Sequence, residues 1–413
     1  MIKEIYTQRY GKALTAVILL ILAIFSMKTV SIIQSWHSGQ DSLHSAQFKK
    51  EFMANPEDYW EYEYDEHDHE KVIKYTLPEY IEKESYLFIE GSLSEVGPGE
   101  VIPANLSFMR YGDSSFFFVS AIVALCGFLL FFVDQKTSFN RFLFSLGVSR
   151  KQLFCGKLLY VALPLLGVFA LGIAGMIVGL WLGIPQPYLN ISIGQMVSSG
   201  FLVLVTCFFF FGISCFCGVM FGNLVFGPLT YVILMWSLQF LPNILGNMSQ
   251  LGYYLIYHKE LPEKLNYFNS YGIDRLYTFD LASYKIYWPL VGFLLFVGGV
   301  LLLWSYRKYQ RLSLEHDGEY LLYPESRWPI WTLAVLYLSL FAIFGYTQIW
   351  NFYIYSQLDP AGGWDQSLSV TIFATVIRIL LALAISTLLL FFGPVKKWLR
   401  NRREVRTPKL IRE

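Results

Sequence analysis

Four histidines and a dense acidic run are the groups best suited to metal binding or acid–base chemistry in this sequence. The histidines are His37, His44, His67 and His69, and the last two lie within an acidic run from Glu57 to Glu70. Imidazole and carboxylate groups together could hold a cation or act as bases. However, no H-E-x-x-H spacing and no serine or cysteine nucleophile motif accompanies them. A solvated acidic surface is the simpler interpretation, and we predict no catalytic and no metal-binding residue.

The cysteines and the glycine–lysine pair carry no further chemistry. Cys215-Phe-Cys217 lies in an apolar run and favours buried thiols over a metal site. No cysteine lies in the long outer loops described below, so no disulfide scaffold is expected. Gly156-Lys157 is followed by Leu158, and the sequence contains no G-x-x-x-x-G-K-[ST] phosphate loop. The chain is therefore not expected to bind a nucleotide or another cofactor itself.

The elements that must position these residues are long apolar blocks. Apolar residues make up 55% of the 413 residues and charged residues 15%, against roughly 25% charged in ordinary soluble domains. Eight blocks approach or exceed the 20 or so residues needed to cross a bilayer. They are Ala13–Ile33, Ser114–Val133, Leu158–Gly183, Met196–Val219, Leu224–Phe240, Ile286–Tyr306, Pro329–Ile349 and Leu368–Phe392. We predict an all-α polytopic membrane protein, which excludes a nucleic-acid binder, a secreted disulfide scaffold and a disordered chain.

Charge asymmetry orients these spans. With the N-terminus inside, the inner segments carry 20 Lys and Arg against 8 Asp and Glu, while the outer loops carry 10 against 23. The positive-inside rule therefore places both termini in the cytoplasm and the protein in the cell membrane. The basic tail, residues 393–413, should lie on the anionic inner leaflet as a lipid contact.

Two cations, Lys28 and Arg378, fall within the predicted spans, and no Asp or Glu does. A buried arginine costs at least about 2.5–3.5 kcal/mol on insertion scales. Arg378 is therefore predicted to face the helix bundle and to bond carbonyls, hydroxyls or lipid phosphate. The missing carboxylates argue against a transporter coupled to protons or sodium.

The connections between the spans complete the domain organisation. Residues 34–113 are predicted to form a small extracellular α+β domain, with a strand near Glu84 to Leu93, and its acids could attract a cationic peptide. In the third span, Gly175, Gly179 and Gly183 form two G-x-x-x-G steps that favour close helix packing. The predicted segments are 1–33 (cytoplasmic N-terminus and first span), 34–113, a core of spans two to six over 114–306 with an outer interfacial or re-entrant segment over 241–285, a cytoplasmic loop over 307–328, the last two spans over 329–392, and the tail.

An amphipathic helix is predicted in the inner loop between the second and third spans, within residues 138–152. The i, i+3, i+4, i+7 spacing that marks one helix face is met by Phe139, Phe142, Leu143 and Leu146. Asn140, Arg141 and Ser145 lie off that face. We expect this helix to lie along the cytoplasmic surface.

A sharp turn and a second helix are predicted to follow. Gly147 is suited to a left-handed helix stop. Ser149 and Gln152 have the S-x-x-Q spacing of a capping box. A helix should therefore begin at Arg150 and run through Lys151 and Lys157 into the third span.

The stretch from Phe142 to Lys157 resembles the first cytoplasmic loop of permeases of the second type of ATP-binding-cassette (ABC) exporter. The likeness rests on Leu146, Ser149, Arg150 and Lys157. The wider layout of residues 1–306 is also similar to that family, although Leu146-Gly147 stands where the family often has Leu-Pro. Two additional spans resemble an eight-span Gram-positive subgroup, as do Arg311, Glu315 and Gly318.

The resemblance implies a transport subunit with no enzymatic activity of its own. In such permeases the inner-loop helix docks on a separate ATPase that binds ATP and Mg²⁺, and a second copy or paralogue completes the transporter. The residues that would contact the ATPase here are Phe142, Leu143, Leu146, Gly147, Ser149, Arg150 and Lys151. The expected function is the export or extraction of a peptide, antibiotic or lipid-like substrate. The alternatives are a membrane-embedded enzyme acting on envelope glycans or lipids, and a sensor of cationic peptides.

Overall fold

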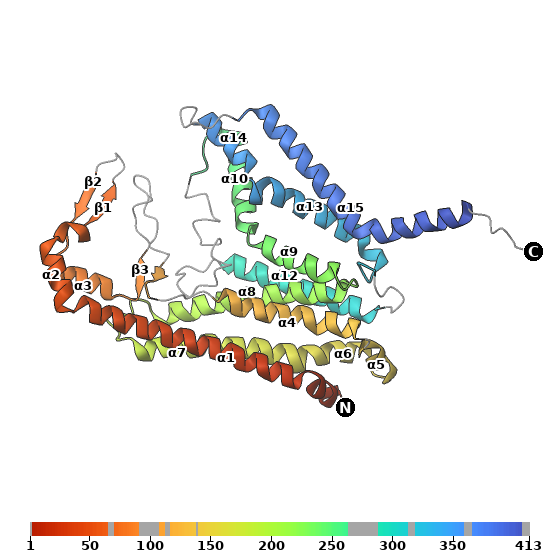
Figure 1. Ribbon diagram of the computed structural model, residues 1–413, viewed down its shortest axis with the longest axis horizontal. Coiled ribbons are helices and arrows are strands. Elements are labelled where there is room, and N and C mark those ends of the chain that lie inside the picture. Colours follow the sequence, from red (N-terminus) through yellow and green to blue (C-terminus); the bar gives the residue numbers. More distant parts are fainter. Residues whose placement is uncertain are drawn as a thin grey trace, which may run out of the picture. The chain divides into compact units, whose positions relative to one another are not determined.

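The structure is a computed structural model of 413 residues, drawn in Figure 1. It describes residues 2–64, 70–90, 107–111, 116–137, 139–262, 288–312, 319–358 and 366–406. Within this described part, seven helices are long and apolar enough to cross a membrane. This confirms the coarse prediction of a helical chain with the composition of a multi-pass membrane protein. The cytoplasmic placement of the termini stays a prediction.

The seven helices coincide with seven of the eight predicted spans, extended at one or both ends. Two of them are continuous runs in which the helix type changes along the axis. They are α1 (Ile2–Leu43), α4 (Phe117–Lys136), the run of α6 (Arg150–Lys157), η3 (Leu158–Ala162) and α7 (Leu163–Gly183), α8 (Ile193–Met220), α12 (Trp288–Gln310), the run of η6 (Pro324–Ser326), α13 (Arg327–Leu340) and η7 (Phe341–Tyr346), and α15 (Leu368–Arg406).

The predicted fifth span, Leu224–Phe240, is not one of these seven helices. Its α9 (Phe226–Leu238) has 13 residues and is followed by α10 (Leu241–Tyr257), with a bend of 51° between the two. Together the two helices are long and apolar enough to form one broken span or a re-entrant loop. The predicted outer segment 241–285 therefore begins as a single 17-residue helix, and residues 263–285 lie outside the described part.

The second helix also differs from its prediction at its inner end. It extends to Lys136 and so includes Asp134, whose side chain is completely buried. A carboxyl group thus lies in the last turn of a spanning helix, where the sequence predicted none. A transporter coupled to protons or sodium was disfavoured on the assumption that no Asp or Glu lies in a span. Asp134 is an exception to that assumption.

The chain divides into two compact units, and the first comprises Met1–Leu125, Cys155–Phe211 and Arg275–Gly299. Its central feature is the long contact between α1 and α7. A Cβ atom at Gly172 would collide with the Phe25 ring, and one at Gly179 would come within 2.6 Å of Thr29. Gly183 meets Ile33 in the same way, whereas Gly175 faces open space. The close-packing positions are thus Gly172, Gly179 and Gly183 rather than the predicted set that began at Gly175.

The long run from α6 to α7 contains a π-helical turn, η3. It ends two residues before Pro164, and the Leu163 N–H bonds to the Leu158 carbonyl. Proline has no N–H and its ring clashes with the carbonyl four residues earlier. A wider π turn relieves this conflict without ending the helix.

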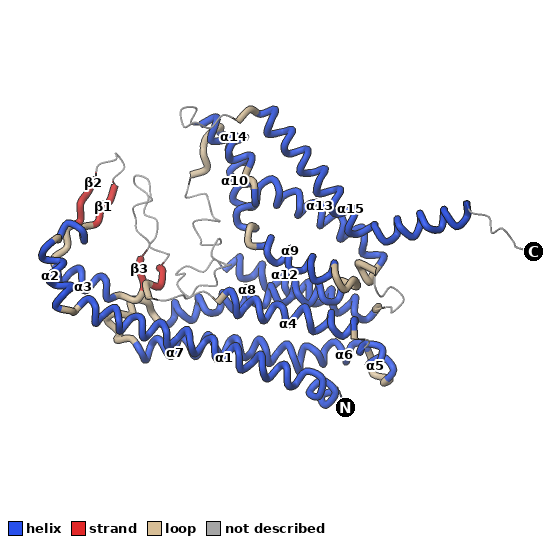
Figure 2. The backbone as a smooth tube through the Cα atoms, viewed as in Figure 1, coloured by secondary structure: helices blue, strands red, loops and turns tan. Residues whose placement is uncertain are grey.

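The segment between α1 and α4 contains the short strands of the molecule's described part (Figure 2). Two antiparallel pairs occur, one with Glu61 opposite Ile73 and one with Phe88 opposite Met109. The elements are α2 (Ala46–Ala54), η1 (Pro56–Tyr59), β1 (Glu61–Tyr64), β2 (Glu70–Ile73), α3 (Leu77–Ser85), β3 (Phe88–Glu90) and β4 (Ser107–Met109).

A cluster of aromatic rings holds this segment together. Phe48 and Phe52 of α2 pack on Tyr59 and Tyr80, with ring centroids 4.9–6.2 Å apart. Of the predicted strand near Glu84 to Leu93, only Phe88–Glu90 is a strand, because α3 runs through Ser85. His67, His69 and residues 91–93 lie outside the described part, and the extracellular placement stays a prediction.

The second unit comprises Cys126–Phe154, Gly212–Asp274 and Val300–Glu413. One of its buried clusters consists of Ile244 from α10, Ile343 and Phe344 from the π-helix η7, and Ile349 from α14 (Ile349–Leu358). Helix α13 also packs along α15, where the Trp331 indole N–H donates to the Thr387 hydroxyl (3.0 Å). The outer helix α10 is thus packed against protein along one side, which the interfacial prediction did not include.

Candidate functional site

The inner loop between α4 and α6 forms the helical hairpin that the sequence predicted. Helix α5 covers Phe139–Ser145, and the next helix begins at Arg150. Between them Gly147 has φ +68°, and nothing lies within 4 Å of where its Cβ would be. The left-handed backbone therefore accounts for glycine here, because an L-residue with a Cβ disfavours this conformation.

The capping box at the start of the second helix is also confirmed. The Gln152 N–H donates to the Ser149 hydroxyl oxygen (3.3 Å), and the Ser149 N–H donates to Gln152 Oε1 (3.3 Å). These bonds satisfy two backbone N–H groups at the end of the turn. The turn is therefore defined on both sides, by Gly147 and by the cap.

The buried face of α5 is rotated from the predicted one. Leu143 is completely buried, but so is Asn140, which the pattern placed off the apolar face. Phe142, predicted to lie on that face, is 50% exposed. The Tyr309 hydroxyl of α12 donates to the Asn140 Oδ1 atom (3.4 Å), which offsets part of the cost of burying this amide. Sequence periodicity alone gives no sign of this partner.

Tyr309 anchors the hairpin to the end of α12. It is completely buried, and its ring centroid lies 5.6 Å from Phe154 of α6 and 6.2 Å from Phe144 of α5. Phe131 of α4 adds a third ring at 5.9 Å. Both helices of the hairpin and the helix that leads into it are therefore packed around one side chain, which the sequence analysis did not select.

Arg150 contributes to the same anchor. Its Nη1 donates to the Gln310 carbonyl (2.9 Å), and its guanidinium lies 4.7 Å from the centre of the Phe144 ring. The arginine therefore binds the C-terminal end of α12, where cations are favoured near unpaired carbonyls. This contact gives it a structural role within the chain in addition to the predicted contact with a partner.

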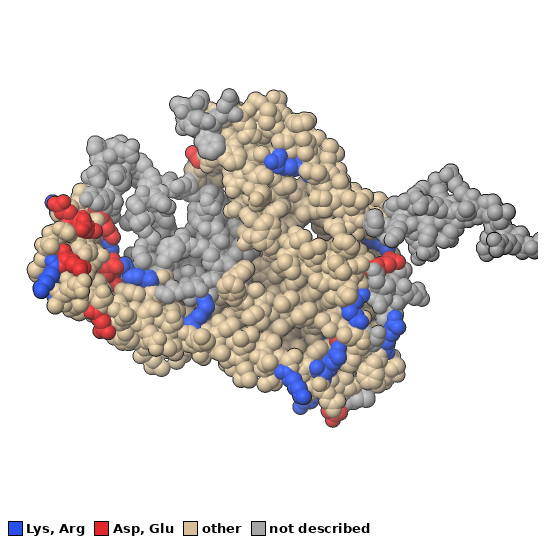
Figure 3. Space-filling view, in the orientation of Figure 1, with Lys and Arg blue, Asp and Glu red and all other residues tan. Residues whose placement is uncertain are grey.

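The opposite side of the hairpin is exposed. Arg141, Phe142, Ser145 and Lys151 all present exposed side chains, and we call these four residues the hairpin outer face. Figure 3 shows basic side chains around α5 and α6. The face combines a half-exposed aromatic ring with two cations. Leu146 is intermediate in burial, so of the predicted contact residues Phe142 and Lys151 are the most accessible, together with the small turn residues Gly147 and Ser149.

The connection between α8 and α9 packs against the chain after α12. The Gly222 N–H donates to the Tyr320 carbonyl and the Leu322 N–H to the Met220 carbonyl, both at 3.0 Å. A Cβ at Gly222 would lie 2.6 Å from the Glu319 carbonyl oxygen. Glycine at position 222 therefore lets this connection pack closely against the backbone at Glu319. Arg311 is exposed, and Glu315 and Gly318, the remaining residues of the weaker resemblance, lie outside the described part.

Arg378 in α15 is partly buried and satisfies one prediction. Its Nη1 donates to the Ala374 carbonyl one turn earlier in the same helix (3.1 Å). Ala374 packs against the cluster of Ile343 and Phe344. The carbonyl bond was expected, but the partner belongs to the arginine's own helix. This arrangement lowers the cost of a cation in an apolar helix and contributes no catalytic group.

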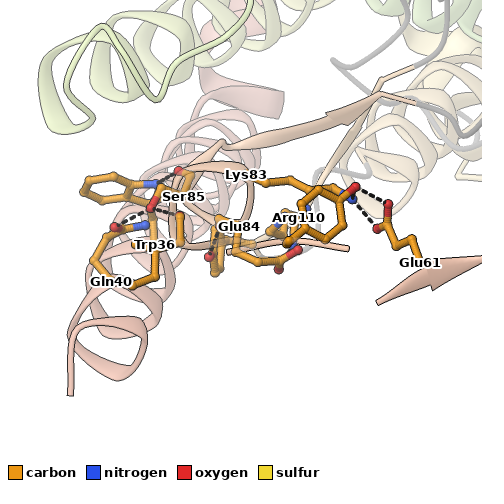
Figure 4. Close-up of polar contacts among 10 residues, drawn as sticks. Trp36, Gln40, Glu61, Lys83, Glu84, Ser85 and Arg110 are labelled. Carbon is orange, nitrogen blue, oxygen red and sulfur yellow. Dashed lines mark hydrogen bonds and ion pairs between the residues drawn. The ribbon is translucent and has the colours of Figure 1, made fainter. Parts of the chain in front are cut away.

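The segment between α1 and α4 is joined to the C-terminal end of α1 by buried and partly buried polar contacts (Figure 4). The Trp36 indole N–H donates to the Ser85 carbonyl (2.9 Å), and the Ser85 hydroxyl donates to Gln40 Oε1 (2.9 Å). Nearby, Arg110 pairs with Glu84. The C-terminal part of α1 therefore holds the end of α3 in place.

The connection between α7 and α8 holds the same segment. The Leu87 N–H donates to the Tyr188 carbonyl (2.9 Å). The Asn190 side chain donates to the Phe88 carbonyl (2.7 Å) and accepts from the Phe88 N–H (3.0 Å). Asn190 thus pairs with β3 much as a neighbouring strand would.

The outward surface of this segment is acidic, as Figure 3 shows. Its exposed acids include Asp41, Glu51, Glu57, Asp58, Glu61, Glu79 and Glu82, beside three exposed lysines, Lys49, Lys50 and Lys74. Burial by itself would raise the pKa of Glu61, but hydrogen bonds from Lys83 and Tyr75 outweigh this and lower the pKa below its ordinary value. Glu61 is therefore an ion-pair partner within the segment.

No cluster of three His, Cys, Asp or Glu side chains that could hold a metal occurs within the described residues. His37 on α1 and His44, directly after the end of α1, are both exposed. No protein-family model, no curated protein and no solved structure matches this chain. The functional assignment therefore depends on the geometry described above and on the sequence resemblance.

Proposed function

We propose that this chain is the membrane-spanning permease subunit of an ABC transporter. A separate ATPase would dock on the hairpin outer face, and its movement would pass into the spans through the hairpin. The cargo class would be a peptide, an antibiotic or a lipid-like molecule, exported or extracted from the membrane. A second copy or a paralogue would complete the transporter, with ATP and Mg²⁺ bound by the ATPase.

The observation that carries this proposal is the two-sided construction of the hairpin. One side is fixed to α12 through Tyr309 and Arg150. The other side exposes Phe142 between cations rather than burying it. Aromatic side chains and arginine are enriched at protein interfaces relative to the rest of the surface. An interfacial helix that serves only to fix topology would also expose Phe142, to the lipid head groups, and the docking experiment separates the two roles.

The direct test is co-purification with an ABC ATPase, and an ATPase gene found in the neighbouring reading frame would supply the candidate and favour the proposal. Phe142→Ser with Lys151→Glu should weaken binding about tenfold or more, since losing about 1.4 kcal/mol of interface energy has that effect. Stimulated ATP hydrolysis should fall with it. Lys12→Glu is the matched control, because Lys12 is an exposed cation on α1 outside the hairpin.

The variants avoid Arg150 because its loss would also break the contact with Gln310 and confuse docking with folding. Unchanged binding and ATPase stimulation in the double variant, at an unchanged melting temperature, would contradict the docking proposal. Zinc-dependent turnover of an envelope glycan or lipid by the purified chain would instead favour the enzyme alternative.

A sensor of cationic peptides is the second candidate, and the acidic outward surface favours it. Glu57 and Asp58 are both exposed beside the aromatic cluster, and the segment is tied to α1 through Trp36. A cationic peptide should bind the purified chain with an affinity that falls as salt rises. Glu57→Gln with Asp58→Asn should weaken that binding, and salt-independent binding unaffected by the substitutions would argue against this role.

A further inference from the structure

A groove of about 300 Å³ lies between α1 and α7, inside the first unit. Five lining residues come from one face of α1 and four from α7. They are Leu22, Phe25, Ser26, Thr29 and Val30, and Leu171, Gly172, Gly175 and Met176. Both sets lie near the middle of helices long enough to span a membrane. The groove therefore lies at the depth of the hydrocarbon core if these helices cross a bilayer.

Two glycines on α7 create this space, but they do so differently. Gly172 lets the Phe25 ring pack directly on the helix backbone, whereas nothing lies within 4 Å of a Cβ at Gly175. The missing side chain at Gly175 therefore leaves volume that α1 does not fill. Helices α1 and α7 touch at Gly172 and Gly179, and the groove is the space left open at Gly175 between these two contacts.

The lining determines the chemistry of an occupant. None of the nine lining residues is charged. The Thr29 hydroxyl already donates to the Phe25 carbonyl (2.8 Å). Leu22, Val30 and Leu171 at the edge are 37%, 51% and 68% exposed, so the groove continues into the apolar outer surface of these spans. A head group or a charged peptide would find no partner here, whereas a hydrocarbon chain would.

The size of the groove excludes a helix as its occupant. A volume of 300 Å³ equals about ten water molecules at roughly 30 Å³ each. A packed helix has a diameter of about 10–12 Å and could not enter it. A gap left open would forfeit dispersion contacts on both walls. We propose that the groove holds one acyl chain of a membrane phospholipid.

The test is photo-crosslinking of the full chain in phosphatidylglycerol vesicles that contain a phospholipid with a diazirine in the middle of one acyl chain. Labelled peptides are mapped by mass spectrometry. Labels should concentrate on residues 22–30 and 171–176, above the level at the equally exposed α15 residues Leu380 and Leu388. Gly175→Leu fills the groove and should reduce the labels there to the α15 level.

Gly167→Leu is the matched control, because Gly167 lies on the same helix, also faces open space, and does not line the groove. It should leave the labelling unchanged. Even labelling of all exposed apolar residues in the natural chain would overturn the proposal without any variant. So would unchanged labelling in Gly175→Leu, or cross-links from the groove to a second copy of the chain. This inference does not depend on the transport proposal, since it needs no ATPase and is tested without one.

Discussion

The turn at Gly147 gives the sharpest test of how the hairpin is built. Its φ of +68° is left-handed, and the space around a Cβ there is empty. Replacing it by alanine therefore adds no steric contact with the rest of the protein. Any effect of Gly147→Ala must come from the backbone, because an L-residue in this conformation costs roughly 1–2 kcal/mol.

That cost falls on the hairpin alone. Opening the turn is a local event, so a 1–2 kcal/mol loss should raise the population of the open hairpin by a factor of about 5–30. Asparagine enters the left-handed region more readily than alanine does. We therefore expect the order Gly147, then Gly147→Asn, then Gly147→Ala in decreasing protection, with no change in the other helices.

Amide hydrogen exchange read by mass spectrometry measures this directly in the full chain. The informative amides are Leu146, bonded to the Leu143 carbonyl (3.3 Å), and Leu153, bonded to the Ser149 carbonyl (3.1 Å). Gly167→Ala is the control, because alanine is the better helix former by about 1 kcal/mol and that site is helical and open. Equal exchange in Gly147→Ala and the natural chain would refute the argument, as would an Asn variant no better protected than the Ala variant.

Three further outcomes are expected. Tyr309→Ala should destabilise the second unit by about 3–5 kcal/mol, as for other large aromatics removed from a core, and Tyr309→Phe by far less; equal melting temperatures for the two would contradict the anchoring role. Asn190→Ala should cost about 1–3 kcal/mol, because it leaves the Phe88 N–H and carbonyl without their partner, and faster exchange of the β3 amides is the readout. Glu61 has a lowered pKa in the folded chain, so its ion pair with Lys83 should stabilise the segment above pH 4.5, the ordinary value, and lose that effect as the pH falls through the lowered value; the difference in melting temperature between Glu61→Gln and the natural chain should shrink as the pH falls below 4.5, and a difference that stays constant on acidification would refute the assignment.

The parts of the fold that follow from local chemistry could be predicted from the sequence. Gly147 needs only its own backbone, and Ser149 with Gln152 needs only three residues of chain, so the turn and the second helix were both correct. The seven long helices follow from unbroken apolar blocks in the same way. The fifth span was not recovered as one long helix: α9 begins at Phe226 and runs through Gly227-Pro228, and the bend comes after Leu238, just before Pro242 in the first turn of α10. Helix α10 then packs against η7.

The helix contacts could not be predicted, because they depend on partners far apart in the sequence. The periodic glycines pointed to Gly175, but the register between α1 and α7 makes Gly172 the contact and leaves Gly175 open. The sequence likewise gave no reason to select Tyr309, which lies more than 160 residues from Asn140. A single tyrosine at the end of an apolar block resembles an ordinary interfacial aromatic.

The rotated face of α5 is the error that bears most on function. The spacing placed Phe142 and Leu143 together on one face, apart from Asn140, and the resemblance made both Phe142 and Leu143 contact residues for the ATPase. A hairpin that buried that whole face would present a polar surface with little to offer a partner. Instead the chain uses a hydrogen bond from Tyr309 to bury the asparagine and leaves the phenylalanine outside. Exposing a large apolar side chain beside Arg141 and Lys151 brings no stability to the isolated chain. The arrangement makes physical sense when another surface covers Phe142, and this is why the docking test is directed at that residue rather than at the buried Leu143.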